Sequence, residues 1–238
     1  MTESINQKTS DLTNHVGNIL AFESSTKNYH IAVSPKNSNS VYEISSTNYE
    51  IENFFRLTDR ILEETKIALS EIENIVCLRG PSSFTGIRKN LTIATALTFC
   101  SKTKVFTISC LAAQCYLTHK QTQAEVVFVA NDARREEVFF AAYGFKDKTT
   151  AYCLEKDSLV KPEDITIPDM DPEQTLSMVG NGWEQYQKKL PKRLRGLPTV
   201  KIKTVLPSAL ISFSLKYPNL LETMTEDAQP NYLRHPVK

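Results

Sequence analysis

The sequence predicts an α/β protein made of two similar halves. Three short runs with the apolar or alternating pattern of β-strands come first, at residues 19–22, 29–34 and 40–45. Helical patterns then alternate with further apolar runs as far as residue 119. A second, shorter series of strand-like runs begins at residue 125, so the arrangement of the first half starts again.

In the first half, a helix is expected to follow the third strand. Thr47 and Glu50 have the spacing of a capping box, and apolar residues then recur on one helical face, with charged residues on the other. The remaining expected elements of this half are a strand at 75–78, a helix at 84–100, a strand at 104–108 and a helix capped by Ser109 that runs to about His119. This order of three strands, helix, strand, helix and strand is typical of a ribonuclease-H-like domain.

The second half repeats this order in a shorter form. Its expected elements are strands at 125–130, 137–145, 151–154, 176–179 and 199–202 and helices at 183–190 and 207–217. The acidic, proline-containing segment 155–173 is expected to be a loop. Actin-like ATPases and sugar kinases are built from two ribonuclease-H-like halves, so the sequence predicts this fold with the second half reduced. A fold of this kind does not by itself determine the function.

The domain boundaries are expected where these series of elements change. Residues 1–17 are polar and are expected to form a flexible extension. The first domain is expected at 18–109 and the second at 110–205. The C-terminal segment 206–238 begins with a helix, and we expect it to return to the first domain.

The segment GPSSFTGIR, residues 80–88, is expected to join a strand to a helix. Gly80 suits a backbone conformation that other residues avoid, Pro81 presets the turn, and Ser82 or Ser83 can cap the helix. Free N–H groups at such a turn, with an arginine nearby, would suit an anion. The spacing alone favours an ordinary capped turn over a phosphate loop, because no Gly-Lys-Ser/Thr follows as a Walker motif requires.

The helix expected at 84–100 is apolar on more than one face. Its first stripe consists of Phe84, Ile87, Leu91, Ala94 and Thr98, and its second of Ile93, Leu97 and Cys100. A helix that is apolar on two faces must be covered on two sides. One face is therefore expected to pack on the sheet, and the other on a second layer of this chain or on a partner.

The composition is that of an ordinary globular protein. The 238 residues are 41% hydrophobic and 23% charged, and the formal net charge of +1 gives no overall attraction to nucleic acid or membranes. No apolar run approaches the roughly 20 residues that a bilayer span needs, and the polar N-terminus lacks the apolar core of a secretory signal. The five cysteines form no CxxC pair, and we expect reduced, buried thiols in a cytoplasmic protein.

Five motifs, in order from about residue 18 to residue 234, resemble those of the TsaB (YeaZ) family. GPSSFTGIR is close to that family's GPGSFTGxR, and ILAFESST resembles its opening ILAIDTST. NDARREEVF resembles its DARRxEVY, VGNG its glycine pair before a helix, and PNYLR its C-terminal PxYLR. The resemblance covers nearly the whole chain.

This resemblance implies a non-catalytic subunit of the complex that forms threonylcarbamoyladenosine in tRNA, on the adenosine 3′ of the anticodon. Members of the family are relatives of TsaD, which transfers the threonylcarbamoyl group, and they pair with TsaD or with themselves through two N-terminal-domain helices. The ATPase TsaE joins the complex, tRNA is bound through the complex, and ATP or ADP is expected only at the interface with TsaD. The helices at 50–70 and 84–100 would form this interface through Phe54, Ile61, Leu62, Leu69, Phe84, Ile87, Leu91, Ala94 and Thr98.

The same motifs single out residues that would lie near an anion or nucleotide. These are Glu23, Ser24, Ser82, Ser83, Thr85, Arg88, Asp132, Arg134 and Arg135. Four positions depart from the family pattern: Glu23 replaces its usual Asp, Ser82 a glycine, and Thr47-Asn48 a His-Ser pair. For the charged residues that follow the strand at 125–130, shaping a turn is as good an interpretation as contacting a partner.

Two other functions remain open, a small-molecule kinase or ATPase and a protease that acts on its own paralogue. An ATPase needs an adenosine loop, which residues 180–182 could supply, and a magnesium-binding acid, for which Glu23 or Asp132 would be needed. The four histidines share no helical spacing, so no histidine metal site is predicted, and no Ser–His–Asp set can be picked out. Seven basic residues between 188 and 203 could contact tRNA phosphates, although we favour a solvated face neutralised by the acidic loop.

Overall fold

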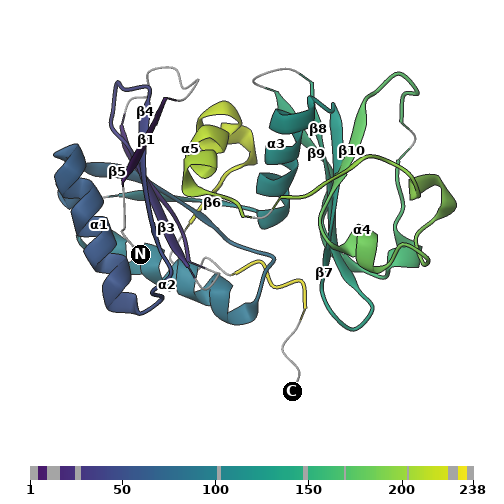
Figure 1. The fold of residues 1–238 in the computed structure, drawn as a ribbon, viewed down its shortest axis with the longest axis horizontal. Coiled ribbons are helices and arrows are strands. Elements are labelled where there is room, and N and C mark those ends of the chain that lie inside the picture. The colour runs from purple at the N-terminus through teal and green to yellow at the C-terminus, as the bar shows by residue number, and fades with distance from the viewer. Residues whose placement is uncertain are drawn as a thin grey trace. The chain divides into compact units, whose positions relative to one another are not determined.

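The structure is a computed structural model, and it describes residues 5–9, 17–24, 28–100, 103–146, 150–168, 170–202, 204–224 and 230–234. The chain divides into two compact units, each built around one β-sheet (Figure 1). The first unit comprises residues 1–108 and 206–230, and the second comprises residues 109–205 and 231–238.

The first unit contains a seven-stranded sheet in the order β1-β4-β3-β2-β5-β6-β12. Its strands are β1 (Asn6–Thr9), β2 (Asn18–Glu23), β3 (Tyr29–Ser34), β4 (Ser40–Ser46), β5 (Ile72–Leu78), β6 (Lys104–Ile108) and β12 (Glu222–Thr223). The strands β2, β3 and β4 are antiparallel neighbours, whereas β5 runs parallel to both β2 and β6. The sheet therefore has an antiparallel meander on one side of β2 and a parallel pair on the other.

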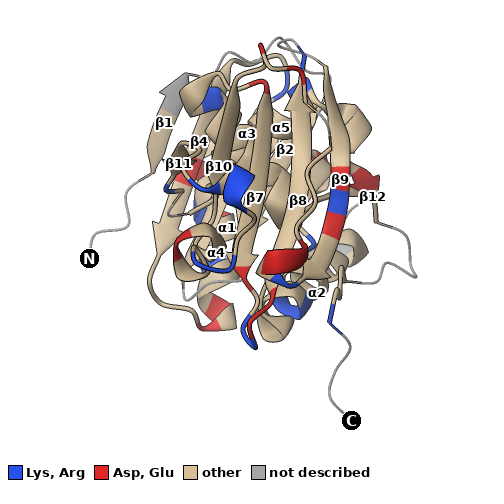
Figure 2. Ribbon diagram, turned by 90° about the vertical axis from the view of Figure 1, so that its right-hand side faces the viewer, with Lys and Arg blue, Asp and Glu red and all other residues tan. Residues whose placement is uncertain are grey.

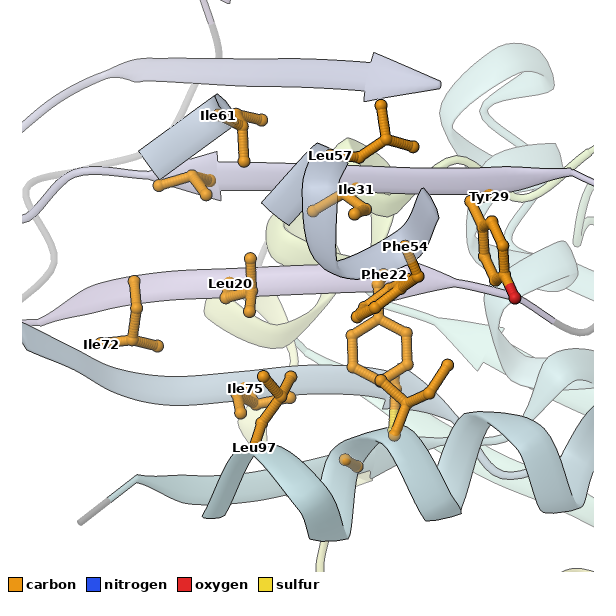
Figure 3. Packing of buried hydrophobic residues seen from close by; sticks show 14 of the residues in the cluster. Leu20, Phe22, Tyr29, Ile31, Phe54, Leu57, Ile61, Ile72, Ile75 and Leu97 are labelled. Atoms are coloured by element: carbon orange, nitrogen blue, oxygen red, sulfur yellow. The ribbon is translucent and has the colours of Figure 1, made fainter. Parts of the chain in front are cut away.

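Helices cover both faces of this sheet. The helices α1 (Ile51–Thr65) and α2 (Phe84–Cys100) share one buried cluster with β2, β3 and β5, and α5 (Pro207–Lys216) lies on the opposite face (Figure 1). Figure 3 shows the centre of the cluster, where Phe22 of β2 meets Phe54 of α1 with their ring centroids 5.3 Å apart and edge to face. Burial of these large apolar side chains is the main contribution to the stability of this unit.

The second unit has a five-stranded sheet in the order β11-β10-β7-β8-β9. Its strands are β7 (Val126–Asp132), β8 (Val138–Phe145), β9 (Ala151–Val160), β10 (Leu176–Val179) and β11 (Thr199–Val200). The first three are antiparallel neighbours, and β10 runs parallel to β7 and β11. When the two edge strands β1 and β12 are set aside, both sheets place their five successive strands in the order 3-2-1-4-5. The predicted α/β fold of two ribonuclease-H-like domains, as in actin-like proteins, is confirmed.

The helices of the second unit are fewer and shorter. The helix α3 (Cys110–Thr122) covers one face of the sheet, and its start is capped by Ser109, whose Oγ accepts hydrogen bonds from the N–H groups of Leu111 and Ala112. The other face carries α4 (Gly182–Gln185), four residues long where α2 of the first unit has 17. A 3-10 turn at Pro162–Asp164 lies between the third and fourth strands, where the first unit has α1.

Several local predictions are wrong. The capping box of Thr47 and Glu50 is absent, because α1 begins at Ile51 and Glu50 itself is the N-cap, whose side chain forms no cap and whose N–H donates to Asn48 Oδ1 at 3.1 Å. The helix expected at 183–190 ends at Gln185. The loop expected from residue 155 begins only after β9 ends at Val160. Charges on β9 are tolerated because it is an edge strand, and such charges discourage pairing with another chain (Figure 2).

Two terminal assignments also differ from expectation. Residues 6–9 of the expected extension form the edge strand β1, which pairs antiparallel with β4. Residues 231–238 belong to the second unit, although the whole segment 206–238 was expected to join the first. No helix among the described residues combines the length and the apolar character that crossing a membrane requires. Of the thiols that the structure describes, Cys77, Cys110 and Cys115 are buried as expected, whereas Cys153 is exposed.

Candidate functional site

In the first unit, the carboxyl ends of β2 and β5 meet the first turns of α2. The N–H and Oγ of Ser24 donate to Asn90 Oδ1, at 2.9 and 2.5 Å, and Asn90 Nδ2 donates to the carbonyl of Leu78 at 3.2 Å. Ser24 and Asn90 are both buried. We call Glu23, Ser24, Lys89 and Asn90 the strand-end cluster, and its hydrogen bonds tie β2, β5 and α2 together.

The predicted strand–turn–helix junction lies beside this cluster. Gly80 has φ of 97°, and a Cβ there would lie 2.6 Å from Ile87 Cδ1. Ser83 caps α2, because its Oγ accepts from the N–H of Gly86 at 3.2 Å and its carbonyl accepts from the N–H of Ile87 at 3.0 Å. The junction is therefore the ordinary capped turn that the spacing favoured, with Gly80 in a conformation that suits glycine.

Glu23 is a buried acidic residue at the end of β2, and Lys89 lies within its electrostatic reach. Glu23 is 1% exposed. Burial lowers the pKa of Lys89, and the attraction of Glu23 opposes that shift. The Lys89 Nζ also lies 4.7 Å from the centroid of the Tyr29 ring, a cation–π contact. Among the residues that the structure describes, no three His, Cys, Asp or Glu side chains gather as a metal site would require.

Other residues predicted near an anion lie outside this cluster. Thr85 and Arg88 are on the exposed face of α2, and the Arg88 guanidinium stacks 3.9 Å from the centroid of the Phe84 ring. Ser82 is half-buried in the turn. Lys89 and Asn90 were not among the predicted site residues, although their spacing on the first turns of α2 places them beside the strand ends.

We expect Asn90→Leu to destabilise the first unit by about 2 kcal/mol. The change leaves the buried N–H of Ser24 without its acceptor, and each unsatisfied buried group costs about 1–3 kcal/mol. Chemical denaturation followed by circular dichroism measures the loss. Thr92→Leu, on the exposed face of the same helix, is the control. Equal stability of the two variants would show that the Asn90 network contributes nothing.

In the second unit, the charged residues that follow β7 are held in a compact turn. The N–H of Asp132 donates to Asn181 Oδ1 at 2.9 Å. Asp132 Oδ1 accepts from the Arg134 N–H and from the Tyr186 hydroxyl, both at 2.8 Å. The Arg134 guanidinium lies 3.4 Å from Asp132 Oδ2, and Arg135 is exposed. Asp132 and Arg134 thus contact each other, and these contacts agree with the turn-shaping interpretation.

The glycines at the end of β10 are packed against the backbone of β7. Gly180 has φ of 110°, and a Cβ there would lie 2.2 Å from the carbonyl oxygen of Ala130. At Gly182 the corresponding distance is 2.9 Å. The Trp183 Nε1 donates to the carbonyl of Val179 at 2.9 Å, so the start of α4 is tied to the end of β10, the strand that precedes it. These glycines serve close packing inside the unit.

The pKa of Asp132 predicts a dependence of stability on pH. Burial raises this pKa, but the hydrogen bonds from Tyr186 and Arg134 outweigh burial and lower it below the ordinary 3.8. A lowered pKa means that the carboxylate stabilises the fold above pH 3.8 and that this contribution is lost as the pH falls through the folded value. We therefore expect the wild type to be more stable than Asp132→Asn at pH 6, with a difference that shrinks below pH 3.8. Thermal unfolding across this range measures it, and a constant difference would contradict the assignment.

The basic segment from Lys188 to Lys201 is held largely by contacts within the unit. The Lys189 Nζ pairs with Glu136 at 2.8 Å, and the Lys201 Nζ with Glu184 at 3.4 Å. The guanidinium of Arg193 donates to the carbonyl of Ile167, and that of Arg195 to the carbonyls of Leu190 and Lys188. The acidic partners Glu136 and Glu184 lie outside the segment 155–173 that was expected to neutralise this face. The preference for a solvated face over contact with tRNA stays a prediction. Lys203 lies outside the described residues.

The predicted partner interface needs correction. Six of its residues are buried in the core of the first unit, namely Phe54, Ile61, Leu62, Ile87, Leu91 and Ala94. These six pack against the sheet of this chain, so the prediction that they contact a partner is wrong. Leu69 and Thr98 are half-buried, and Phe84 is 40% exposed.

The exposed faces of α1 and α2 nevertheless carry large apolar side chains. Five of the exposed large hydrophobic residues are on these helices or just before α1, namely Tyr49, Ile51, Phe55, Phe84 and Phe99. Phe99 is 86% exposed. The exposed residues of α2, which include Thr92 and Thr95, recur at spacings of three and four, and α2 contains no acidic residue. We call these five residues, with Arg88, Thr92 and Thr95, the helical face. The sequence signal that could have found it is the stripe 84–88–92–95–99, opposite the buried one.

Comparisons with known proteins agree with one another. Residues 43–224 match the family model described as TsaD, tRNA N6-adenosine threonylcarbamoyltransferase. The tRNA threonylcarbamoyladenosine biosynthesis protein TsaB of Haemophilus influenzae is 28% identical over 230 residues, which cover 92% of this chain and 94% of that protein. The protein of the same name from Escherichia coli is 28% identical over 180 residues, 74% of this chain and 77% of that protein.

Solved structures share the fold. A Pseudomonas aeruginosa protein, described as uncharacterized with similarity to the peptidase YEAZ, has a TM-score of 0.77 and 24% identity, and the match covers 92% of this chain and 100% of that chain. YeaZ from the same organism has a TM-score of 0.71 and 23% identity, over 84% of this chain and 91% of that chain.

Proposed function

Because the chain belongs to the TsaD family of tRNA N6-adenosine threonylcarbamoyltransferases, we propose that it serves threonylcarbamoyladenosine formation in tRNA as a TsaB-type subunit. In this proposal it binds TsaD and supplies no reaction centre of its own. The names of its curated relatives, which match along most of their length, support this role. The observation that carries it is the helical face.

The helical face has the properties of a surface that another protein covers. Aromatic side chains are enriched at protein interfaces and often dominate their energies, and the helical face exposes four of them, Tyr49, Phe55, Phe84 and Phe99. Two neighbouring helices that pack on one sheet present ridges into which two helices of a partner can fit. We propose that TsaD occupies this face and that a second copy of the chain occupies it when TsaD is absent.

The strand-end cluster supports a non-catalytic role. The Ser24 hydroxyl and the Asn90 amide are used in hydrogen bonds to each other and to Leu78. These side chains are therefore engaged in holding the fold together. We propose that ATP or ADP is bound only where TsaD completes the site, that TsaE joins the assembly, that tRNA is bound through the assembly, and that the protein works in the cytoplasm.

Depletion of the protein tests the proposed function. Cells that lose it are expected to lose threonylcarbamoyladenosine from total tRNA, measured by chromatography and mass spectrometry of hydrolysed nucleosides. Re-expression of the wild type should restore the nucleoside, whereas Phe99→Glu should not. An unchanged level of the nucleoside after depletion would overturn the proposal.

Calorimetry separates this role from that of a free-standing kinase or ATPase. Titration of the isolated chain with ATP and magnesium is expected to give no saturable heat, because we propose that nucleotide binds only beside TsaD. Binding by the isolated chain, followed by hydrolysis, would instead favour the enzyme.

A further inference from the structure

The turn between β7 and β8 has backbone angles that residues other than glycine rarely adopt. Arg134, Arg135 and Glu136 have φ values of 65°, 55° and 61°. The left-handed region is unfavourable for residues with a Cβ, and those that visit it usually do so singly. Three in succession persist only when the surroundings determine the conformation.

One set of contacts reaches this turn from the segment around α4. Asn181 and Tyr186 hold Asp132, which in turn accepts the N–H of Arg134. The Lys189 Nζ pairs with Glu136 at 2.8 Å. These contacts fix the start and the middle of the turn from within the folded body of the unit.

A second set of contacts comes from the C-terminal segment. Arg234 forms an ion pair with Glu137, and its Nη2 also donates to the carbonyl of Arg134 at 3.3 Å. Each side chain of this ion pair is about one-third exposed or less. Arg234 therefore closes the turn by holding both its first carbonyl and the residue that follows it.

The same segment has another anchor, on β9. Asn231 Nδ2 donates to Asp157 Oδ2 at 2.7 Å. Asp157 also accepts from the Ser109 Oγ at 2.6 Å and from the Tyr143 hydroxyl at 3.2 Å. The anchor is thus a carboxylate already oriented by two donors. Residues 231–234, which we call the C-terminal strap, span from this carboxylate to the turn.

We propose that the C-terminal strap is a releasable clasp that keeps residues 134–136 left-handed. Both anchors are made by side chains of the strap, so they can open while the sheet of the unit stays intact. With the strap bound, Arg134 and Arg135 are presented on a fixed turn, where Arg134 is 86% exposed. With the strap released, the hydrogen bonds that close the turn at Ala133 and Glu137 open, while the contacts of Asp132 and Glu136 with the α4 segment remain. This proposal does not rest on the proposed function.

Hydrogen exchange of the free, full-length chain tests the clasp. Two backbone amides donate the hydrogen bonds that close the turn. The N–H of Ala133 donates to the carbonyl of Glu137 at 2.9 Å, and the N–H of Glu137 donates to the carbonyl of Arg134 at 3.1 Å. In Arg234→Ala we expect both to exchange about tenfold faster or more, while the β7 amides stay protected. Arg193→Ala, which removes an arginine–carbonyl contact elsewhere in the same unit, should leave the turn unchanged.

A second variant distinguishes a clasp from a purely local contact. Asn231→Asp places a carboxylate against Asp157 and repels the strap at the anchor on β9, away from the turn. If the strap acts as one device, the amides of Ala133 and Glu137 should exchange about threefold faster or more in this variant as well. Unchanged exchange at the turn in Asn231→Asp, or in Arg234→Ala, would overturn the proposal.

Discussion

Phe99→Glu is expected to weaken association with TsaD by about 100-fold or more while leaving the chain folded. Phe99 is 86% exposed, so the change removes little packing within this chain. In a complex that covers the helical face, the new carboxylate would be buried without a partner, which costs several kcal/mol. A 100-fold loss corresponds to about 2.7 kcal/mol, within the range of aromatic hot spots. Calorimetric titration of the purified pair measures the affinity, and circular dichroism checks the fold.

Two control variants make this test specific. Tyr152→Glu changes another exposed aromatic residue, on β9 of the second unit, and should bind TsaD as the wild type does. Leu91→Glu alters the buried side of α2 and should unfold the first unit, because Leu91 belongs to its core. Wild-type affinity in Phe99→Glu would show that the helical face lies outside the interface.

Local sequence signals predicted most of the central elements. The bounds of β3, α2, β6 and β10 are those expected from apolar periodicity and turn residues. The role of Ser109 as a cap was also predictable, because serine before an apolar run has one strong local use. Elements with weak apolar character could not be predicted from local signals. The strands β1 and β12 are short, polar and at the edges of the sheet, and they exist because a neighbouring strand offers a hydrogen-bonding edge.

The candidate interface was harder to predict than the helices that carry it. Phe54 and Phe55 are adjacent and both apolar, yet one is fully buried and the other is 40% exposed. Periodicity restricts the buried stripe to a face, but α2 has apolar residues on two faces and either could pack on the sheet. Only the tertiary arrangement chooses between them. The C-terminal strap was beyond prediction for the same reason, since Arg234 and Glu137 are distant in the sequence.

Gly180→Ala is expected to destabilise the second unit by about 3–5 kcal/mol. The new Cβ would lie 2.2 Å from the carbonyl oxygen of Ala130, which is fixed in the middle of the sheet. Overpacking of this kind costs about 1–3 kcal/mol, and a left-handed backbone with a side chain costs a similar amount. The protein has a single tryptophan, Trp183, which is buried in the core of this unit. Its fluorescence during chemical denaturation reports the stability of the second unit.

Gly196→Ala is the matched control, because it separates backbone strain from crowding. Gly196 also has positive φ, at 100°, but among the described residues no heavy atom other than its own and those of its chain neighbours lies within 4 Å of the position of a Cβ. Only the cost of placing a side chain on a left-handed backbone is expected there, which lowers the stability by about 1–2 kcal/mol. Similar losses of unfolding free energy in the two variants would mean that Gly180 is needed for its backbone angle alone. There would then be room beside Ala130 for a ligand, and a role of residues 180–182 as an adenosine loop would again be supported. A loss at Gly180 that exceeds the loss at Gly196 by about 2 kcal/mol or more would instead mean that the glycine turn is filled by the protein's own backbone.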